Sequence, residues 1–300
     1  MRALITGATG FVGRKLVAML DRPVVLSRDA QKAKQTLGDV TSFAWDPIAA
    51  VPPAQAFEGV DVVFHLAGDP VAEGRWTAAK KQRIRDSRVI GTRNLVDGIA
   101  MATHKPPVLV SASAVGFYGS RGDVELDETA QPGNDFLAEV CVAWEKESQR
   151  AESFGVRVVN PRIGIVLGRD GGALKQMLTP FRLGVGGRLG SGKQWMPWVH
   201  LDDLLGLFLH AATHGEVRGA MNAVAPNPVI NREFTRVLAA VLHRPAIFPV
   251  PELALRLLLG GFTEVLMGSQ HVIPRVAQQT GYSFRYAQLR EALESIVRGA

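Results

Sequence analysis

The chain of 300 residues is 47% hydrophobic and carries a formal net charge of +6 at pH 7. This length and apolar content suffice for an α/β domain with a smaller substrate-binding lobe. The single cysteine, Cys141, excludes an internal disulfide and favours a reducing, cytoplasmic location, and we expect neither a signal peptide nor a membrane-spanning segment.

Short apolar runs alternate with helical patterns through the first half of the chain. The predicted strands cover residues 3–6, 24–27, 42–45, 60–66, 107–113 and 156–162, and the two long predicted helices cover residues 76–101 and 135–154. This alternation predicts an α/β fold of the Rossmann type, with a doubly wound parallel sheet covered by helices on both faces.

After residue 165 the pattern loosens into glycine-rich segments, which predict a smaller C-terminal substrate lobe. We expect three parts: a nucleotide-binding core at 1–165, to which later segments return, a lobe with returning core elements at 166–248, and a helical extension at 249–300.

A glycine-rich turn directly follows the first predicted strand. Gly7, Gly10 and Gly13 recur every three residues between that strand and a helical pattern. The first glycine permits a tight turn, the second lets the backbone approach a pyrophosphate, and the third lets the helix pack closely on the strand. The residues expected to bind the pyrophosphate are Gly7, Thr9, Gly10, Phe11, Val12 and Gly13.

The end of the second predicted strand discriminates between NAD and NADP. An acidic residue at this position would accept hydrogen bonds from the adenosine ribose of NAD. Here the strand ends in Ser27 and Arg28, and Asp29 follows one position late. The guanidinium of Arg28 suits a 2′-phosphate, and Ser27 adds a hydroxyl. The sequence therefore predicts NADP(H) as the cofactor.

Basic residues occur along the whole chain, and we expect the densest cluster, residues 80–85, to be a solvent-exposed helix face. His65 and His200 occur singly, without the spacing of metal ligands, so we expect them to pack or to form local hydrogen bonds. No aromatic and basic RNA-binding motif is present. The sequence therefore predicts a small-molecule substrate, with no metal, nucleic acid or membrane as partner.

Four segments in chain order resemble the extended short-chain dehydrogenase/reductase family, of the NAD-dependent epimerase/dehydratase type. They are residues 6–13, 61–68, 111–113 and 198–203. Further segments resemble an epimerase-like subgroup of that family, with a short C-terminal helical domain, that is sometimes labelled as related to a cell-division inhibitor. These are Trp76, residues 86–93, 194–198 and 222–227, and the helical tail.

The resemblance implies further roles at the cofactor. Arg88 stands where the family has an asparagine that approaches the cofactor, so we expect its guanidinium to bind a phosphate or ribose. The other residues implied to line the cofactor are Leu66, Ala67 and Gly68 beside adenine and ribose, Ser111, and Pro161, Arg162 and Ile163 at the nicotinamide.

The Tyr-x-x-x-Lys pair on which the family's chemistry rests is missing. Aligning Glu145 with the family's downstream glutamate puts Leu137 at the tyrosine position and Cys141 at the lysine position. Neither side chain can take over the proton transfer or the fixed positive charge. The remaining catalytic candidates are Ser113, which resembles the family's polarising serine, and Tyr118, for which a packing role is the alternative.

These observations predict an NADP(H)-binding oxidoreductase of the atypical extended class that acts on a small carbonyl or hydroxyl compound, as a monomer or a homodimer. Two alternatives stay open. The missing pair favours a non-catalytic NADP(H)-binding sensor or assembly protein, and the family resemblance also allows a sugar-nucleotide epimerase with substituted catalytic residues.

Overall fold

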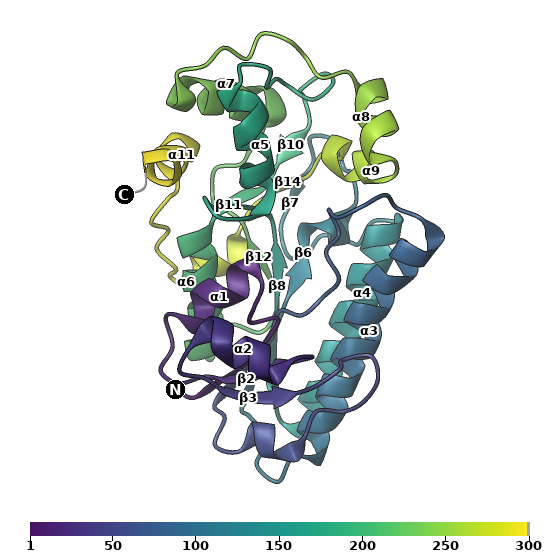
Figure 1. Ribbon diagram of the computed structural model, residues 1–300, viewed down its shortest axis with the longest axis vertical. Helices are drawn as coiled ribbons and strands as arrows, with labels where there is room; N and C mark the ends of the chain where they lie inside the picture. Colours follow the sequence, from purple (N-terminus) through teal and green to yellow (C-terminus); the bar gives the residue numbers. More distant parts are fainter. Residues whose placement is uncertain (299–300) are drawn as a thin grey trace.

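The computed structural model describes residues 1–298, and a parallel sheet forms its centre (Figure 1). The strand order is β12-β8-β5-β4-β1-β2-β3, and β6 also pairs with β8. Every pairing in this sheet is parallel, which confirms the predicted doubly wound fold. Its strands are β1 (Ala3–Thr6), β2 (Val24–Ser27), β3 (Thr41–Ala44), β4 (Val62–His65), β5 (Val108–Ser111), β6 (Ser113–Ala114), β8 (Arg157–Ile163) and β12 (Gly219–Ala223).

The predicted strands agree with these bounds to within two residues, except at 107–113. That segment divides into β5 and β6, with Ala112 between them. β1, β4 and β5 are buried along their whole length, because helices cover both faces of a parallel sheet.

Helices cover the two faces of the sheet in separate groups. α1 (Phe11–Val17), α2 (Ala30–Leu37) and α6 (Leu201–Thr213) share a core with alternate strand residues such as Ile5 and Phe64. The other residues of the same strands, such as Leu4 and Val63, pack with α3 (Ala78–Met101) on the opposite face. α4 (Phe136–Gln149) lies beside α3 (Figure 1). Alternation of side chains along each strand supplies both cores.

Side-chain caps begin both long helices. Thr77 accepts a hydrogen bond from the amide of Lys80 at the start of α3, and Asp135 accepts one from the amide of Ala138 at the start of α4. Each cap satisfies an amide that the first helical turn leaves unpaired. The helix predicted at 135–154 is shorter, because α4 ends at Gln149 and a 3₁₀ segment, η3 (Arg150–Phe154), follows.

The smaller lobe lies at one end of the long axis of the molecule (Figure 1). Its core is a separate hydrophobic cluster that includes Trp198 and Phe234. The elements that build or border the lobe are β9 (Ile165–Leu167), α5 (Gly172–Arg182), β10 (Trp195–Met196), β11 (Trp198–His200), β13 (Val229–Ile230) and α7 (Asn231–Leu242).

The C-terminal extension contains α8 (Glu252–Leu259), α9 (Phe262–Met267), β14 (His271–Val272), α10 (Arg275–Gln279) and α11 (Leu289–Arg298). Short helices were expected here, but β14 also pairs in parallel with β7 (Glu125–Leu126). Asp203 anchors the tail, since its carboxylate accepts hydrogen bonds from the amides of Arg285 and Tyr286. The three-part division of the chain stays a prediction. Within the described residues, no helix is both long and apolar enough to cross a membrane.

Two further 3₁₀ segments are η1 (Ala54–Phe57) and η2 (Val115–Tyr118).

The expectation that the basic cluster at residues 80–85 is a solvent-exposed helix face was wrong for Lys80. This side chain is buried, and its Nζ pairs with Oδ2 of Asp69 at 2.5 Å. The ion pair joins the start of α3 to the loop that follows β4, so it braces the edge of the sheet at which β4 ends.

Candidate functional site

The glycine turn between β1 and α1 has a geometry that only glycine allows at two positions. Gly7 has a φ of +69°, and a Cβ there would lie 2.8 Å from the carbonyl carbon of Leu66. A side chain on Gly13 would collide with the carbonyl of Gly7. Gly10 begins α1 without a side-chain cap, and the first turn holds no acidic residue. The first-turn amides are therefore available to an anion.

A buried hydrogen-bond clamp holds this turn against the end of β4. Oγ1 of Thr6 accepts from the amides of Leu66 and Ala67, each at 3.1 Å. Because Oγ1 of Thr6 already accepts two hydrogen bonds, its hydroxyl donates to Nδ1 of His65 at 2.7 Å. Nδ1 then carries no proton, so Nε2 of His65 is protonated and donates to Oγ1 of Thr92 at 2.9 Å. Burial, with a smaller effect of the Arg88 charge, lowers the pKa of His65 to about 3. His65 is therefore a neutral structural residue, as expected.

The end of β2 carries an exposed guanidinium and a carboxylate that caps a helix. Arg28 is exposed, whereas Oδ1 of Asp29 accepts from the amide of Lys32 at 2.8 Å and caps α2. Oγ of Ser27 accepts from the Asp29 amide at 3.4 Å. One carboxylate oxygen of Asp29 is therefore engaged by the helix, and the exposed Arg28 is a group that can meet a ligand there.

Arg88 lies on α3, directly beside Gly68. A Cβ on Gly68 would lie 3.1 Å from the guanidinium carbon of Arg88, and that carbon lies 5.1 Å from the ring centre of Trp144. Nη1 donates to the carbonyls of Asp69 at 3.0 Å and Ile84 at 3.2 Å. Burial lowers the pKa of Arg88. The side chain is thus part of the wall beside Gly68 rather than of the solvent-exposed helix face, and its contact with a cofactor stays a prediction.

Both catalytic candidates belong to one buried polar network. Oγ of Ser113 donates to Oε1 of Glu145 at 2.6 Å. The Glu145 carboxylate receives two hydrogen bonds from Arg162, each at 2.9 Å. Nη1 of Arg162 donates to the Tyr118 hydroxyl at 3.0 Å, and that hydroxyl donates to Oδ1 of Asn222 at 2.7 Å. Four segments of the chain therefore meet through side chains that water does not reach.

This network determines what the candidates are able to do. Tyr118 is fully buried, and burial raises its pKa to about 12, so the phenol stays protonated and its proton is engaged by Asn222. Ser113 is equally inaccessible, and its proton is engaged by Glu145. Arg162, which the resemblance implies at the nicotinamide, is paired with Glu145 instead of being free. The roles of Ser113 and Tyr118 in catalysis stay predictions.

Glu128 extends the network to the C-terminal extension. Its Oε1 accepts from the amides of Asn222 at 2.9 Å and Val276 at 3.1 Å. Burial raises the pKa of Glu128. Sequence reasoning missed Glu128, Asn222 and the role of Glu145, because no local spacing connects them.

Leu137 and Cys141 lie one turn apart on the same face of α4. A Cβ on Gly116 would lie 3.4 Å from Cβ of Leu137 and 3.9 Å from Sγ of Cys141. Burial, followed by the Glu145 charge, raises the pKa of Cys141 to about 12. The thiol is therefore neutral near pH 7, and the α4 face carries neither a phenol nor a cation at these two positions.

The remaining predicted residues lie at the same edge of the sheet. Ser111 ends β5 opposite His65 of β4 and is buried. Pro161 is buried within β8, and Ile163, at the end of that strand, is partly buried. Thr9 is exposed in the glycine turn. The carboxyl ends of the parallel strands thus bring together residues that are far apart in the sequence. Among the residues that the structure describes, no three His, Cys, Asp or Glu side chains are grouped as metal ligands.

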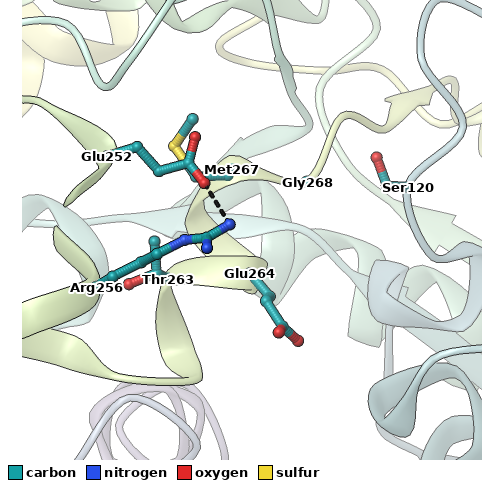
Figure 2. Close-up of a pocket in the computed structure, with 7 residues that line it drawn as sticks. All are labelled: Ser120, Glu252, Arg256, Thr263, Glu264, Met267 and Gly268. Carbon is teal, nitrogen blue, oxygen red and sulfur yellow. Dashed lines mark ion pairs between the residues drawn. The ribbon is translucent and has the colours of Figure 1, made fainter.

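A pocket of about 200 Å³ lies elsewhere, between α8, α9 and the loop at Ser120 (Figure 2). Glu252 and Arg256, one turn apart on α8, line the pocket and form an ion pair of 2.7 Å that is largely exposed. None of the predicted site residues lines this pocket. The glycine turn and the strand ends, which carry the predicted residues, stay the candidate functional site.

Comparison with known proteins identifies the family of the chain. A model of the NAD dependent epimerase/dehydratase family matches residues 3–223, and a model of a domain of unknown function, DUF1731, matches residues 250–296. The epimerase family protein SDR39U1 homolog, chloroplastic, of Arabidopsis thaliana is 41% identical and is aligned over 99% of this chain and 87% of its own. The epimerase family protein YfhF of Bacillus subtilis is 36% identical over 99% of this chain and 98% of its own.

Solved structures of epimerase proteins also match the chain. The human epimerase family protein SDR39U1 (isoform 2), crystallised with NADPH, superimposes with a TM-score of 0.91 at 33% identity and covers 100% of both chains. A nucleoside-diphosphate sugar epimerase of Corynebacterium glutamicum has a TM-score of 0.80 at 33% identity, over 99% of this chain and 58% of its own. The predicted resemblance is confirmed, and the chain belongs to the NAD dependent epimerase/dehydratase family.

Proposed function

We propose that the chain binds NADP(H) at the glycine turn, with the 2′-phosphate at Arg28. The observation that carries this proposal is that Arg28 is exposed at the end of β2, whereas the carboxylate of the next residue, Asp29, caps α2. An arginine offers donors to a phosphate, whereas NAD requires an acceptor for the ribose hydroxyls. The human relative crystallised with NADPH supports the same choice.

The glycine turn can receive a pyrophosphate because the backbone of the turn is exposed to solvent on one side. Thr9 and Gly10 are exposed, and Gly10 contributes no side chain that would cover the first-turn amides of α1. The Thr6 clamp keeps Leu66 and Ala67 against Gly7, so the adenosine side of the site is already ordered. Such preorganisation reduces the entropy that binding costs.

We further propose that the chain is an oxidoreductase that acts on a small carbonyl or hydroxyl compound. The nicotinamide supplies or accepts the hydride when the cofactor is bound. Ser113 is the candidate hydroxyl for the substrate oxygen, because it follows β5 at the edge of the sheet where the glycine turn lies. Since Ser113 is buried, the substrate must open the network around it to reach this hydroxyl. The Ser113 hydroxyl donates to Glu145 in the structure and must rotate to donate to the substrate oxygen instead. Glu145 therefore positions Ser113.

A second candidate function is a non-catalytic NADP(H)-binding sensor or assembly protein. The observation that favours it is the apolar pair Leu137 and Cys141 on the face of α4, where the family carries its acid and its cation. The same observation weakens a sugar-nucleotide epimerase, which would need that pair for its proton transfers.

Titration with both cofactors tests the NADP(H) assignment. A charge-assisted hydrogen bond contributes about 1.5–3 kcal/mol, which corresponds to about a ten- to hundredfold preference for NADPH. Arg28→Ala should lose that preference while its NADH affinity is unchanged. Arg83→Ala, which removes an exposed arginine of α3, is the matched control. Equal affinities of the wild type for NADPH and NADH would overturn the assignment.

Turnover separates the two candidate functions. NADPH at 100 times its dissociation constant should add about 2.7 kcal/mol of stability in either case. Acid-base assistance contributes about 10²–10⁴-fold, so we expect slow NADPH oxidation with aldehydes, ketones and quinones, and loss of that activity in Ser113→Ala. Strong stabilisation by NADPH with no turnover on any of them would favour the sensor or assembly protein.

A further inference from the structure

The positive net charge of the chain comes from two segments of the lobe. Residues 171–201 contain four basic residues and no acidic one, and residues 231–251 contain three arginines and one glutamate. Removing these seven basic residues and one acidic residue from the totals of 34 and 28 leaves 27 of each sign. The rest of the chain is therefore neutral, although basic residues occur throughout it.

The two segments lie side by side in the structure. The amide of Val250 donates to the carbonyl of Arg188 at 2.8 Å, and the amide of Gly190 donates back to the carbonyl of Val250 at 2.9 Å. Nε of Arg244 donates to the carbonyl of Arg182 at 3.0 Å. Figure 1 shows α5 and α7 at the end of the molecule opposite to β2 and β3. The excess positive charge is thus gathered at one end of the long axis.

Apolar side chains project from the same end. Among the described residues, seven large apolar side chains are exposed by 64% or more, and four of them lie on the two adjacent loops that follow α5 and α7. We call the last residue of α5 with the loop after it, residues 182–185, together with the loop at residues 244–248, the lobe tip. Its four apolar side chains are Leu183 (73% exposed), Val185 (64%), Ile247 (76%) and Phe248 (72%).

Exposed apolar side chains beside an excess of basic residues suit a surface that meets a charged lipid bilayer. Apolar side chains on projecting loops enter the boundary between headgroups and acyl chains, and arginines beside them neutralise anionic headgroups. Arg182 and Arg244 are exposed within the lobe tip. Nucleic acid is disfavoured, because Phe248 is the only aromatic side chain of the tip and single-strand binding uses several stacking platforms.

We propose that the lobe tip docks on the surface of an anionic lipid bilayer. The four apolar side chains enter the interface, and Arg182 and Arg244 meet the headgroups. The sequence-based expectation of no membrane partner rested on the lack of a spanning segment, whereas surface docking needs none. Docking leaves the glycine turn free, because the lobe tip and the strand ends are separate parts of the molecule.

Cosedimentation of the full chain with lipid vesicles tests the proposal. Vesicles of phosphatidylcholine mixed with phosphatidylglycerol should bind the protein, vesicles of phosphatidylcholine alone should bind it weakly, and added salt should release it. The double variant Ile247→Ser/Phe248→Ser should bind at least about tenfold more weakly, since it removes two of the apolar groups that enter the interface. Met101→Ser, which changes a side chain that is 71% exposed at the end of α3, is the matched control.

Three results would overturn the proposal. The first is no binding to the phosphatidylglycerol vesicles, and the second is equal binding by the double variant and the wild type. The third is self-association without vesicles that the double variant abolishes, which would assign the lobe tip to a second copy of the chain. NADPH affinity, measured in the same preparations, should be unchanged in the double variant, so this test is separate from that of the cofactor site.

Discussion

Removing the carboxylate of Glu145 should destabilise the fold far more than removing an exposed ion pair. The side chains of Glu145 and Arg162 are only 6% and 5% exposed. Glu145→Ala leaves the Arg162 guanidinium buried with the Tyr118 hydroxyl and the Glu128 carbonyl as its remaining partners. Breaking a buried pair in this way costs about 3–5 kcal/mol.

The expected shift of the melting temperature follows from the size of the chain. An unfolding entropy of roughly 2.1 cal/mol/K per residue gives roughly 600 cal/mol/K for this chain, so 3–5 kcal/mol corresponds to about 5–8 °C. Glu233→Ala is the matched control, because it removes an ion pair with Arg236 whose side chains are 40% and 66% exposed. That loss should cost less than about 1 kcal/mol.

Thermal and urea unfolding followed by circular dichroism measure both variants. Glu145→Gln should be intermediate, because its amide oxygen still accepts the proton of Ser113 while the charge partner of Arg162 is lost. If Glu145→Ala were no less stable than Glu233→Ala, the inference that a dry ion pair holds β8 against α4 would be wrong.

Other residues of the site give separate predictions. Gly10→Val should abolish NADPH binding in calorimetry with an unchanged circular dichroism spectrum, because its side chain takes the space of the pyrophosphate; full affinity would move the nucleotide elsewhere. Arg88→Ala should weaken NADPH binding more than it weakens the fold, and an unchanged dissociation constant would contradict a contact with the cofactor. Cys141→Ser should leave NADPH affinity and any turnover unchanged, because burial holds the pKa of the thiol near 12; an inactive but folded variant would make the thiol a catalytic group. The pKa of His65 is 6.5 when the chain is unfolded and about 3 when it is folded. The contribution of neutral His65 to the free energy of unfolding is therefore fully present above pH 6.5 and should be lost as the pH falls toward 3. Urea unfolding across that range should give a flatter profile for His65→Gln, and parallel profiles would contradict the depressed pKa.

The sequence by itself determined the features that depend on neighbours along the chain. Apolar runs of four to seven residues predicted the strands because a parallel sheet buries both faces of each strand. The spacing of Gly7, Gly10 and Gly13 predicted the turn before α1, since tight backbone turns are local. The missing tyrosine and lysine were evident for the same reason, because both belong to one helical turn.

Only the tertiary structure decided which distant side chains meet. The hydrogen bond from Tyr118 to Asn222 spans 104 residues, and that between Thr6 and His65 spans 59. Such pairs depend on the order of strands in the sheet, which local spacing does not encode. The ion pair of Lys80 with Asp69 spans 11 residues and that of Arg162 with Glu145 spans 17, so each needs a helix to fold back against the end of a neighbouring strand. A charged residue becomes buried only where the fold brings a partner to it, because an unpaired charge is too costly to remove from water.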